Sequence, residues 1–194
     1  MFDQKAATYD TEEKEVVAQT IRKELLRYVQ ETNTKLVDFG GGTGLITIPL
    51  ANQFQEILIL DQSQGMLAQA EKKILAQELE NVRLIHGDEN NLPAGPDIIF
   101  SCQVLHHIHD LKPTLLKMKT ALNSEGQLII VDFIKNESLA DQHHHGFDVE
   151  VLEKQIAALG FTDIESNIIY EDDHLFRNQY AQLFLLRAVK SVDH

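Results

Sequence analysis

The sequence predicts a doubly wound α/β fold with a mostly parallel, seven-stranded sheet and an antiparallel hairpin strand at the C-terminal end. Short apolar runs alternate with helix-like segments from about residue 35 to residue 159, and two strand-like segments then follow each other directly. No linker rich in Gly, Ser or Pro divides the 194 residues. We therefore expect a single domain with an N-terminal cap helix region, a βα core and a C-terminal β-hairpin, at 1–30, 31–160 and 161–194.

The chain begins with an amphipathic helix, which we expect to run from Thr11 to Val29. Asp10 and Glu13 are expected to form a capping box at its start, since each side chain can reach a backbone N–H of the first turn. Apolar residues recur at every fourth position and make one stripe along this helix: Val17, Ile21, Leu25 and Val29.

The middle of the chain alternates between strands and helices. Ser63 and Asp110 are the expected N-caps of the second and third of these helices, and Pro49 fits the first helix only within its first turn. Five apolar runs have the character of buried parallel strands: Lys35–Phe39, Glu56–Leu60, Val82–His86, Asp97–Cys102 and Gln127–Phe133. Three helix-like segments lie between them: Leu45–Phe54, Gln64–Leu79 and Leu111–Leu122.

The alternation changes near the C-terminus. A last helix is expected over Asp148–Leu159, where Asp148 is the N-cap and Gly160 ends the helix. Two strand-like segments, Phe161–Tyr170 and Tyr180–Val189, then follow with only a polar segment, Glu171–Asn178, between them. Two strands with no helix between them predict an antiparallel hairpin.

The most informative segment is Leu36-Val-Asp-Phe-Gly-Gly-Gly-Thr-Gly44, in which four glycines follow a buried strand. Glycine permits positive φ and has no Cβ, so that a ligand can lie directly on the backbone. Asp61 ends the next strand, and a carboxylate at that place can accept hydrogen bonds from the two hydroxyls of a ribose. The glycine turn and Asp61 together indicate a nucleotide of the adenosine type.

The spacing of the glycines argues against two common nucleotides. The dinucleotide fingerprint G-x-G-x-x-G fails from either possible start, because Leu45 or Ile46 stands where its third glycine should be. The chain also lacks the G-x-x-x-x-G-K-[ST] loop that binds ATP or GTP.

Six segments, taken in order, carry a resemblance to a known family: Phe2–Asp10, Asp38–Gly44, Leu60–Met66, Gly87–Glu89, Ser101–Ile108 and Leu122–Asp132. They resemble the motifs of class I S-adenosylmethionine-dependent methyltransferases. The N-terminal stretch resembles the cap of their small-molecule branch, which includes quinone- and biotin-pathway methyltransferases. The resemblance implies a Rossmann-like methyltransferase fold, S-adenosylmethionine as cofactor, and methyl transfer to a small-molecule acceptor by in-line displacement.

The resemblance also implies roles for individual residues. The glycines and the end of the fourth strand would line the methionine part of the cofactor, Asp61 would bind the ribose, and Asp88 would accept a hydrogen bond from the adenine amino group. Asp38 could equally organise the glycine turn, and Met66 could equally belong to the core. The full set is Asp38, Gly40, Gly41, Gly42, Asp61, Gln62, Met66, Asp88, Glu89, Cys102 and Gln103.

The acceptor side is less well defined by the sequence. We expect His107 to act as a general base where the acceptor must lose a proton. Tyr9, His106 and His145 are the expected substrate contacts, with His145 closing the run 143–145. No metal site is expected, because adjacent histidines point to different faces and no carboxylate or cysteine spacing accompanies them.

Composition limits the partners. The formal charge of −13, from 30 acidic and 17 basic residues, disfavours a nucleic-acid partner. Apolar runs of at most four residues predict no membrane span, and the single cysteine, Cys102, fits a cytoplasmic protein. The oligomeric state stays open. Two alternative functions also stay open: an S-adenosylmethionine-binding sensor or partner subunit, and, less favoured, an NAD-dependent oxidoreductase.

Overall fold

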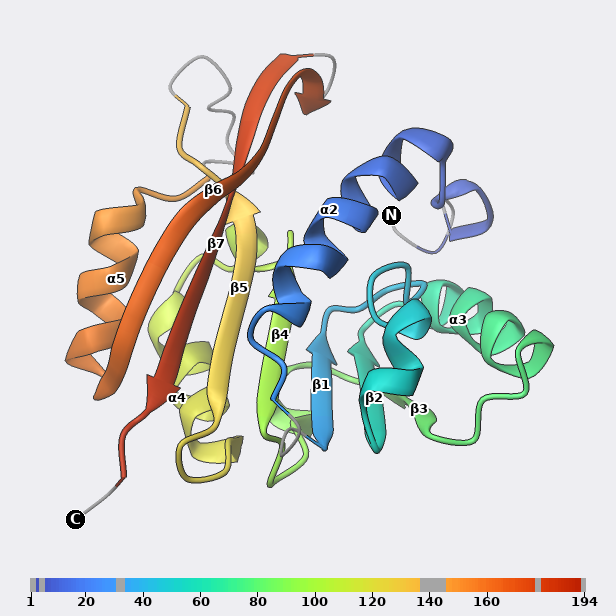
Figure 1. Ribbon diagram of the computed structural model, residues 1–194, viewed down its shortest axis with the longest axis horizontal. Coiled ribbons are helices and arrows are strands. Elements are labelled where there is room, and N and C mark those ends of the chain that lie inside the picture. The colour runs from blue at the N-terminus through green and yellow to red at the C-terminus, as the bar shows by residue number, and fades with distance from the viewer. Residues whose placement is uncertain (1–2, 4–5, 31–33, 137–145, 177–178, 193–194) are drawn as a thin grey trace.

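The computed structural model describes residues 3, 6–30, 34–136, 146–176 and 179–192. Its sheet has seven strands in the order β3-β2-β1-β4-β5-β7-β6 (Figure 1). The first five strands are parallel, and β7 runs antiparallel between β5 and β6, which confirms the expected doubly wound sheet with a C-terminal hairpin. The strands are β1 Lys35–Phe39, β2 Glu56–Asp61, β3 Val82–His86, β4 Ile98–Cys102, β5 Gln127–Phe133, β6 Phe161–Phe176 and β7 Gln179–Lys190.

Helices cover both faces of this sheet (Figure 1). The α-helices with described bounds are α2 Glu12–Leu26, α3 Gln64–Ala76, α4 Leu111–Ala121 and α5 Val149–Ala158. Four short 3₁₀ helices complete the described elements: η1 Ala6–Thr8, η2 Ile48–Gln53, η3 Glu89–Asn91 and η4 Leu105–His107. Among the described residues, no helix is long and apolar enough to span a membrane.

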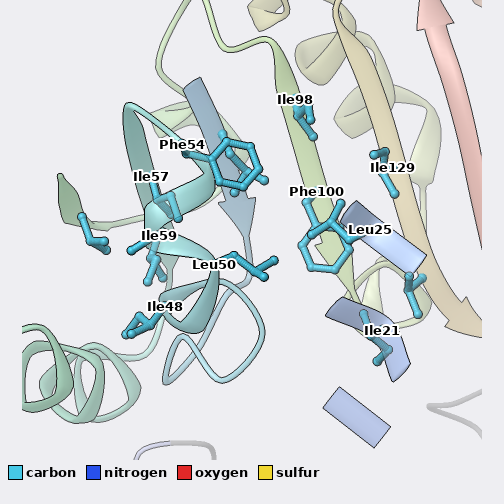
Figure 2. Packing of buried hydrophobic residues seen from close by; sticks show 14 of the residues in the cluster. Ile21, Leu25, Ile48, Leu50, Phe54, Ile57, Ile59, Ile98, Phe100 and Ile129 are labelled. Atoms are coloured by element: carbon cyan, nitrogen blue, oxygen red, sulfur yellow. The ribbon is translucent and has the colours of Figure 1, made fainter. Parts of the chain in front are cut away.

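Two hydrophobic clusters form because side chains alternate across each strand. One cluster packs α2, η2 and α3 on one face of the sheet, where Ile21 and Leu25 approach Phe100 and Ile129 (Figure 2). The other packs α4 and α5 against the opposite face, with Leu115, Met118, Leu152 and Ile156 among its members. The central strands β1, β2, β4 and β5 are therefore buried on both sides, as their continuous apolar runs predict.

The helix caps agree with the sequence except at the first helix. Ser63, Asp110 and Asp148 cap α3, α4 and α5 as predicted. The prediction that Asp10 caps the first helix was wrong, because the Thr11 hydroxyl accepts the N–H of Lys14 there instead. The Asp10 carboxylate accepts a hydrogen bond from Thr43 Oγ1 at 2.7 Å and pairs with Lys73 Nζ at 2.6 Å, so long-range contacts occupy it.

Two other elements differ from the expected ones. The helix expected over Leu45–Phe54 is the shorter η2, whose first turn holds Pro49, the place where a missing N–H costs least. β6 continues through most of the polar segment that was expected to separate the last two strands. Polar cross-strand contacts support this extension, since Glu171 accepts hydrogen bonds from Tyr180 Oη and Gln182 Nε2, both at 2.8 Å.

Candidate functional site

The glycine turn follows β1 directly and folds back onto the end of β2. The N–H groups of Gly40 and Gly41 donate to the carbonyl of Leu60 at 2.7 and 3.3 Å. A Cβ on Gly41 would lie 2.5 Å from Cγ of Asp38, so the turn can pack there only without a side chain. Gly42 has φ +55°, and a Cβ on it would meet only an Asp61 oxygen, at 3.9 Å. The backbone at Gly42 therefore faces open space, where a ligand can approach.

Asp61 is held towards this turn by backbone donors. Its Oδ2 accepts the N–H of Gly42 at 2.9 Å, and its Oδ1 accepts the N–H of Ser63 at 2.8 Å. Partial burial raises the pKa of the Asp61 carboxyl, although these hydrogen bonds act in the opposite direction. The carboxylate is thus oriented before any ligand arrives, and its remaining lone pairs can accept further hydrogen bonds.

Asp38 lies under the glycine turn and is only 2% exposed. Thr47 Oγ1 donates to its Oδ2 at 2.6 Å. Burial raises the pKa of Asp38 to about 7, which the hydrogen bond from Thr47 only partly offsets. The buried carboxyl is costly to ionise, yet it lines a cavity of about 140 Å³ beside α2.

A larger cavity of about 440 Å³ opens at the carboxyl ends of the parallel strands. Its volume lies within the range of about 300–1,000 Å³ that is usual for small-molecule sites. Most of the site residues predicted from the sequence line it: Tyr9, Gly40, Gly42, Asp61, Gln62, Met66, Asp88, Glu89, Cys102, Gln103 and His107. Asp38 and Gly41 line the smaller cavity, which shares Tyr9, Gly40, Gly42, Cys102 and Gln103 with the larger one.

The far end of the larger cavity is formed by η3. The Asp88 carboxylate caps η3 and accepts the N–H of Asn90 at 2.8 Å, which lowers the pKa of Asp88. Lys117 lies 3.4 Å from the Glu89 carboxylate and ties η3 to α4. The two acids therefore lie at a turn that is anchored both internally and to a neighbouring helix.

The end of β4 forms the wall opposite Asp61. Gln103 has φ +56°, and its N–H donates to the carbonyl of Val131 at 2.7 Å. Burial raises the pKa of the Cys102 thiol well above its usual value, so the thiol is neutral near pH 7 and a poor nucleophile. Cys102 thus contributes a small, neutral surface to the cavity.

The histidines occupy different positions. His107 is exposed and lines the larger cavity. The His106 side chain is 4% exposed and contacts Asp132, so it lies behind the wall and lines neither cavity, contrary to the expected substrate contact. His145, another expected substrate contact, falls outside the described residues. Within the described part of the chain, no group of three or more His, Cys, Asp or Glu side chains could hold a metal ion.

Several residues at the site were missed by sequence reasoning. Asp3 lines the larger cavity, where it accepts hydrogen bonds from Ser63 Oγ at 2.6 Å and from the N–H of Gly65 at 2.7 Å. The Ser63 hydroxyl thereby lowers the pKa of Asp3. Lys14 and Leu175 line the smaller cavity. No local pattern marks these residues, because each reaches the site from a distant part of the chain.

Comparison with known proteins places these residues in a family. A family model for a methyltransferase domain matches residues 37–128. The biotin biosynthesis bifunctional protein BioHC of Cellvibrio japonicus is 31% identical over 134 residues, which cover 66% of this chain and 26% of that protein. The demethylmenaquinone methyltransferase of Corynebacterium efficiens is 30% identical over 102 residues, which cover 51% of this chain and 41% of that protein.

The fold is also similar to solved structures. Magnesium protoporphyrin IX methyltransferase (ChlM) from Synechocystis, solved with bound S-adenosylmethionine, superposes with a TM-score of 0.68 at 19% identity. The superposition covers 92% of this chain and 80% of that one.

The family match runs from β1 into β5 and contains the glycine turn, Asp61, Asp88 and Gln103, which are all residues of the cavities described above. The chain spans about a quarter to a half of the length of the curated relatives it matches. Family match, strand order and cavity agree: residues 37–128 match a methyltransferase domain, and the fold is that of the class I S-adenosylmethionine-dependent methyltransferases.

Proposed function

We propose that this protein transfers a methyl group from S-adenosylmethionine to a small-molecule acceptor. The observation that carries the proposal is the single cavity in which the glycine turn, the Asp61 and Asp88 carboxylates and the end of β4 meet. The acidic lining suits a cationic sulfonium, and Gly42 leaves space for a ligand against the backbone. When bound, S-adenosylmethionine supplies an activated methyl group that an acceptor nucleophile takes by in-line displacement.

Each part of the cavity has a role in this proposal. Asp61 binds the ribose hydroxyls, and Gln62 and Met66 flank the same region. Asp88 accepts a hydrogen bond from the adenine amino group, with Glu89 beside it. Orientation of the two reactants is the main contribution of such a site, and it is worth about 7–11 kcal/mol of barrier lowering.

The opposite end of the cavity holds the methionine portion in this proposal. The backbone of the glycine turn lies along it, and the end of β4 closes it. The neutral Cys102 thiol contributes shape rather than charge. Asp38 organises the turn from below through its hydrogen bond with Thr47. The residues on this side are Asp38, Gly40, Gly41, Gly42, Cys102 and Gln103.

Tyr9 and His107 face the acceptor. Tyr9 lines both cavities, and burial raises its pKa to about 12, so its hydroxyl stays protonated and can donate a hydrogen bond. His107 can take a proton from an acceptor that loses one during attack, a role worth roughly 10²–10⁴-fold in rate.

The proposal is tested by calorimetry with purified protein. We expect S-adenosylmethionine and S-adenosylhomocysteine to bind and NAD⁺ to show no heat of binding. Methyl-labelled S-adenosylmethionine is then offered with a panel of small carboxylic acids, phenols, amines and thiols. Saturation by NAD⁺ without binding of S-adenosylhomocysteine would overturn the proposal. Binding with no transfer to any acceptor of the panel would favour the sensor or partner-subunit alternative.

A further inference from the structure

A fully buried carboxylate lies one residue before the end of β5 and is bonded to η4, the turn that carries two histidines. Asp132 is 0% exposed. Its Oδ1 contacts His106 Nδ1 at 2.6 Å and accepts the N–H of Phe133 at 2.8 Å. Its Oδ2 accepts the N–H of His106 at 3.3 Å. One carboxylate therefore bonds both the backbone and the ring of the same histidine.

The His106 ring connects this carboxylate to the cavity wall. Its centroid lies 4.0 Å from that of His107 and 5.4 Å from that of Phe133. His107 in turn lines the cavity of about 440 Å³. Asp132, His106 and His107 thus form a continuous series of contacts from the buried end of a strand to the surface that a ligand would meet.

Packing alone does not account for this arrangement. Burying a carboxylate and an imidazole removes both from water, and apolar residues of similar volume often give equal or greater stability. A carboxylate does offer directed acceptors, which can set the tautomer and the orientation of a histidine ring. The Asp132 contacts constrain both η4 and the His106 ring, which His107 contacts at a tilt of 46°.

We infer that Asp132, acting through His106, is a positioning residue that holds the His107 imidazole at the wall of the cavity. The inference rests on the proposed function, in which His107 meets the acceptor and takes its proton. Asp132 and His106 touch neither cavity themselves. Their effect is to limit the orientations of His107, so that a proton acceptor is already in place when an acceptor molecule binds.

The test compares Asp132→Asn with a matched control, Ser101→Ala. Ser101 is also fully buried near the end of a central strand, but its Oγ has no hydrogen-bond partner among the described residues. Both variants are labelled with ¹⁵N-histidine, and the His107 imidazole signals are assigned with His107→Gln. The spectra are recorded with and without S-adenosylhomocysteine, whose affinity is measured by calorimetry.

We expect D132N to displace the His107 imidazole signals in the free protein and to abolish their response to S-adenosylhomocysteine. S101A should keep the positions of the His107 signals and their response to S-adenosylhomocysteine. The affinity of D132N for S-adenosylhomocysteine should stay within about threefold of that of the parent protein. Unchanged His107 signals in D132N, alongside altered His106 signals, would overturn the inference. Failure of the parent to bind S-adenosylhomocysteine would overturn the proposed function instead, and the free-protein comparison would still decide the inference.

A second variant covers the case in which D132N does not fold. His106→Asn keeps a donor for Asp132 but removes the ring that contacts the His107 ring. We expect it to displace the His107 signals while the signals of the exposed His174 on β6 stay in place. His107 signals that match those of the parent protein would overturn the inference.

Discussion

Asp38 shows how a single buried carboxyl links stability to the site. Its ordinary pKa of 3.8 is raised to about 7 by burial. Between these two values the folded protein binds a proton that the unfolded chain has released, so the free energy of unfolding falls as the pH rises. Above about pH 7 the folded state carries the full cost of an ionised, buried carboxylate.

We therefore predict that Asp38→Asn stabilises the protein at alkaline pH. Asparagine keeps an oxygen for the Thr47 hydroxyl and carries no charge. The gain over the parent protein should grow by roughly 2–3 kcal/mol between about pH 5 and pH 8. Urea denaturation at both pH values measures it. A gain that does not change with pH would contradict the assigned cause.

Asp61 gives the sharpest test of a single ligand contact. Asp61→Asn removes the charge but keeps the size of the side chain, so we predict a loss of about 1–3 kcal/mol in the binding of S-adenosylhomocysteine. Glu56→Gln is the matched control, because Glu56 begins the same strand at its opposite end. Calorimetry should show that E56Q binds S-adenosylhomocysteine with unchanged affinity. Equal losses of affinity in the two variants would contradict the ribose role of Asp61.

At the scale of elements, the glycine turn combines two different requirements. A Cβ at Gly41 would collide with Asp38, whereas Gly42 needs a positive φ and faces open space. We predict that Gly41→Ala chiefly lowers the free energy of unfolding. Gly42→Ala should cost about 1 kcal/mol of stability and chiefly weaken S-adenosylhomocysteine binding. Denaturation and calorimetry on both variants separate the two effects, and identical profiles would contradict the distinction.

The predicted elements also show where local patterns stop being sufficient. Apolar runs and N-caps predicted the parallel strands and the starts of α3, α4 and α5, because these depend on neighbouring residues. The cap of α2 and the length of β6 depended on partners far along the chain. The Asp10 carboxylate is hydrogen-bonded to Thr43 and ion-paired with Lys73, and Glu171 is hydrogen-bonded across the hairpin to β7.

At the scale of the whole molecule, charge should distinguish two related ligands. The chain has a net charge of −13, and several carboxylates line the larger cavity. S-adenosylmethionine carries a sulfonium charge that S-adenosylhomocysteine lacks. We predict that raising the salt concentration from about 50 mM to about 500 mM weakens the binding of S-adenosylmethionine more than the binding of S-adenosylhomocysteine, because ions screen the carboxylates. Calorimetry at the two salt concentrations checks this, and equal weakening would contradict the role of charge.

The sequence by itself determined the succession of strands and helices along the chain, the glycine turn, and the acids at the ends of β2 and β3. These features are local, because each follows from apolar periodicity, from glycine conformation or from a residue's position at a strand end. A parallel sheet places such strand ends along one edge, so most of the predicted ligand-facing residues line the same cavity.

Only the tertiary structure decided which side chains face that cavity and which lie behind it. His106 and His107 are neighbours in sequence, yet His106 turns inward to Asp132 while His107 lines the wall. Asp3 joins the site across sixty positions of sequence through its hydrogen bond with Ser63. Such placements depend on contacts between distant segments, which no local periodicity encodes.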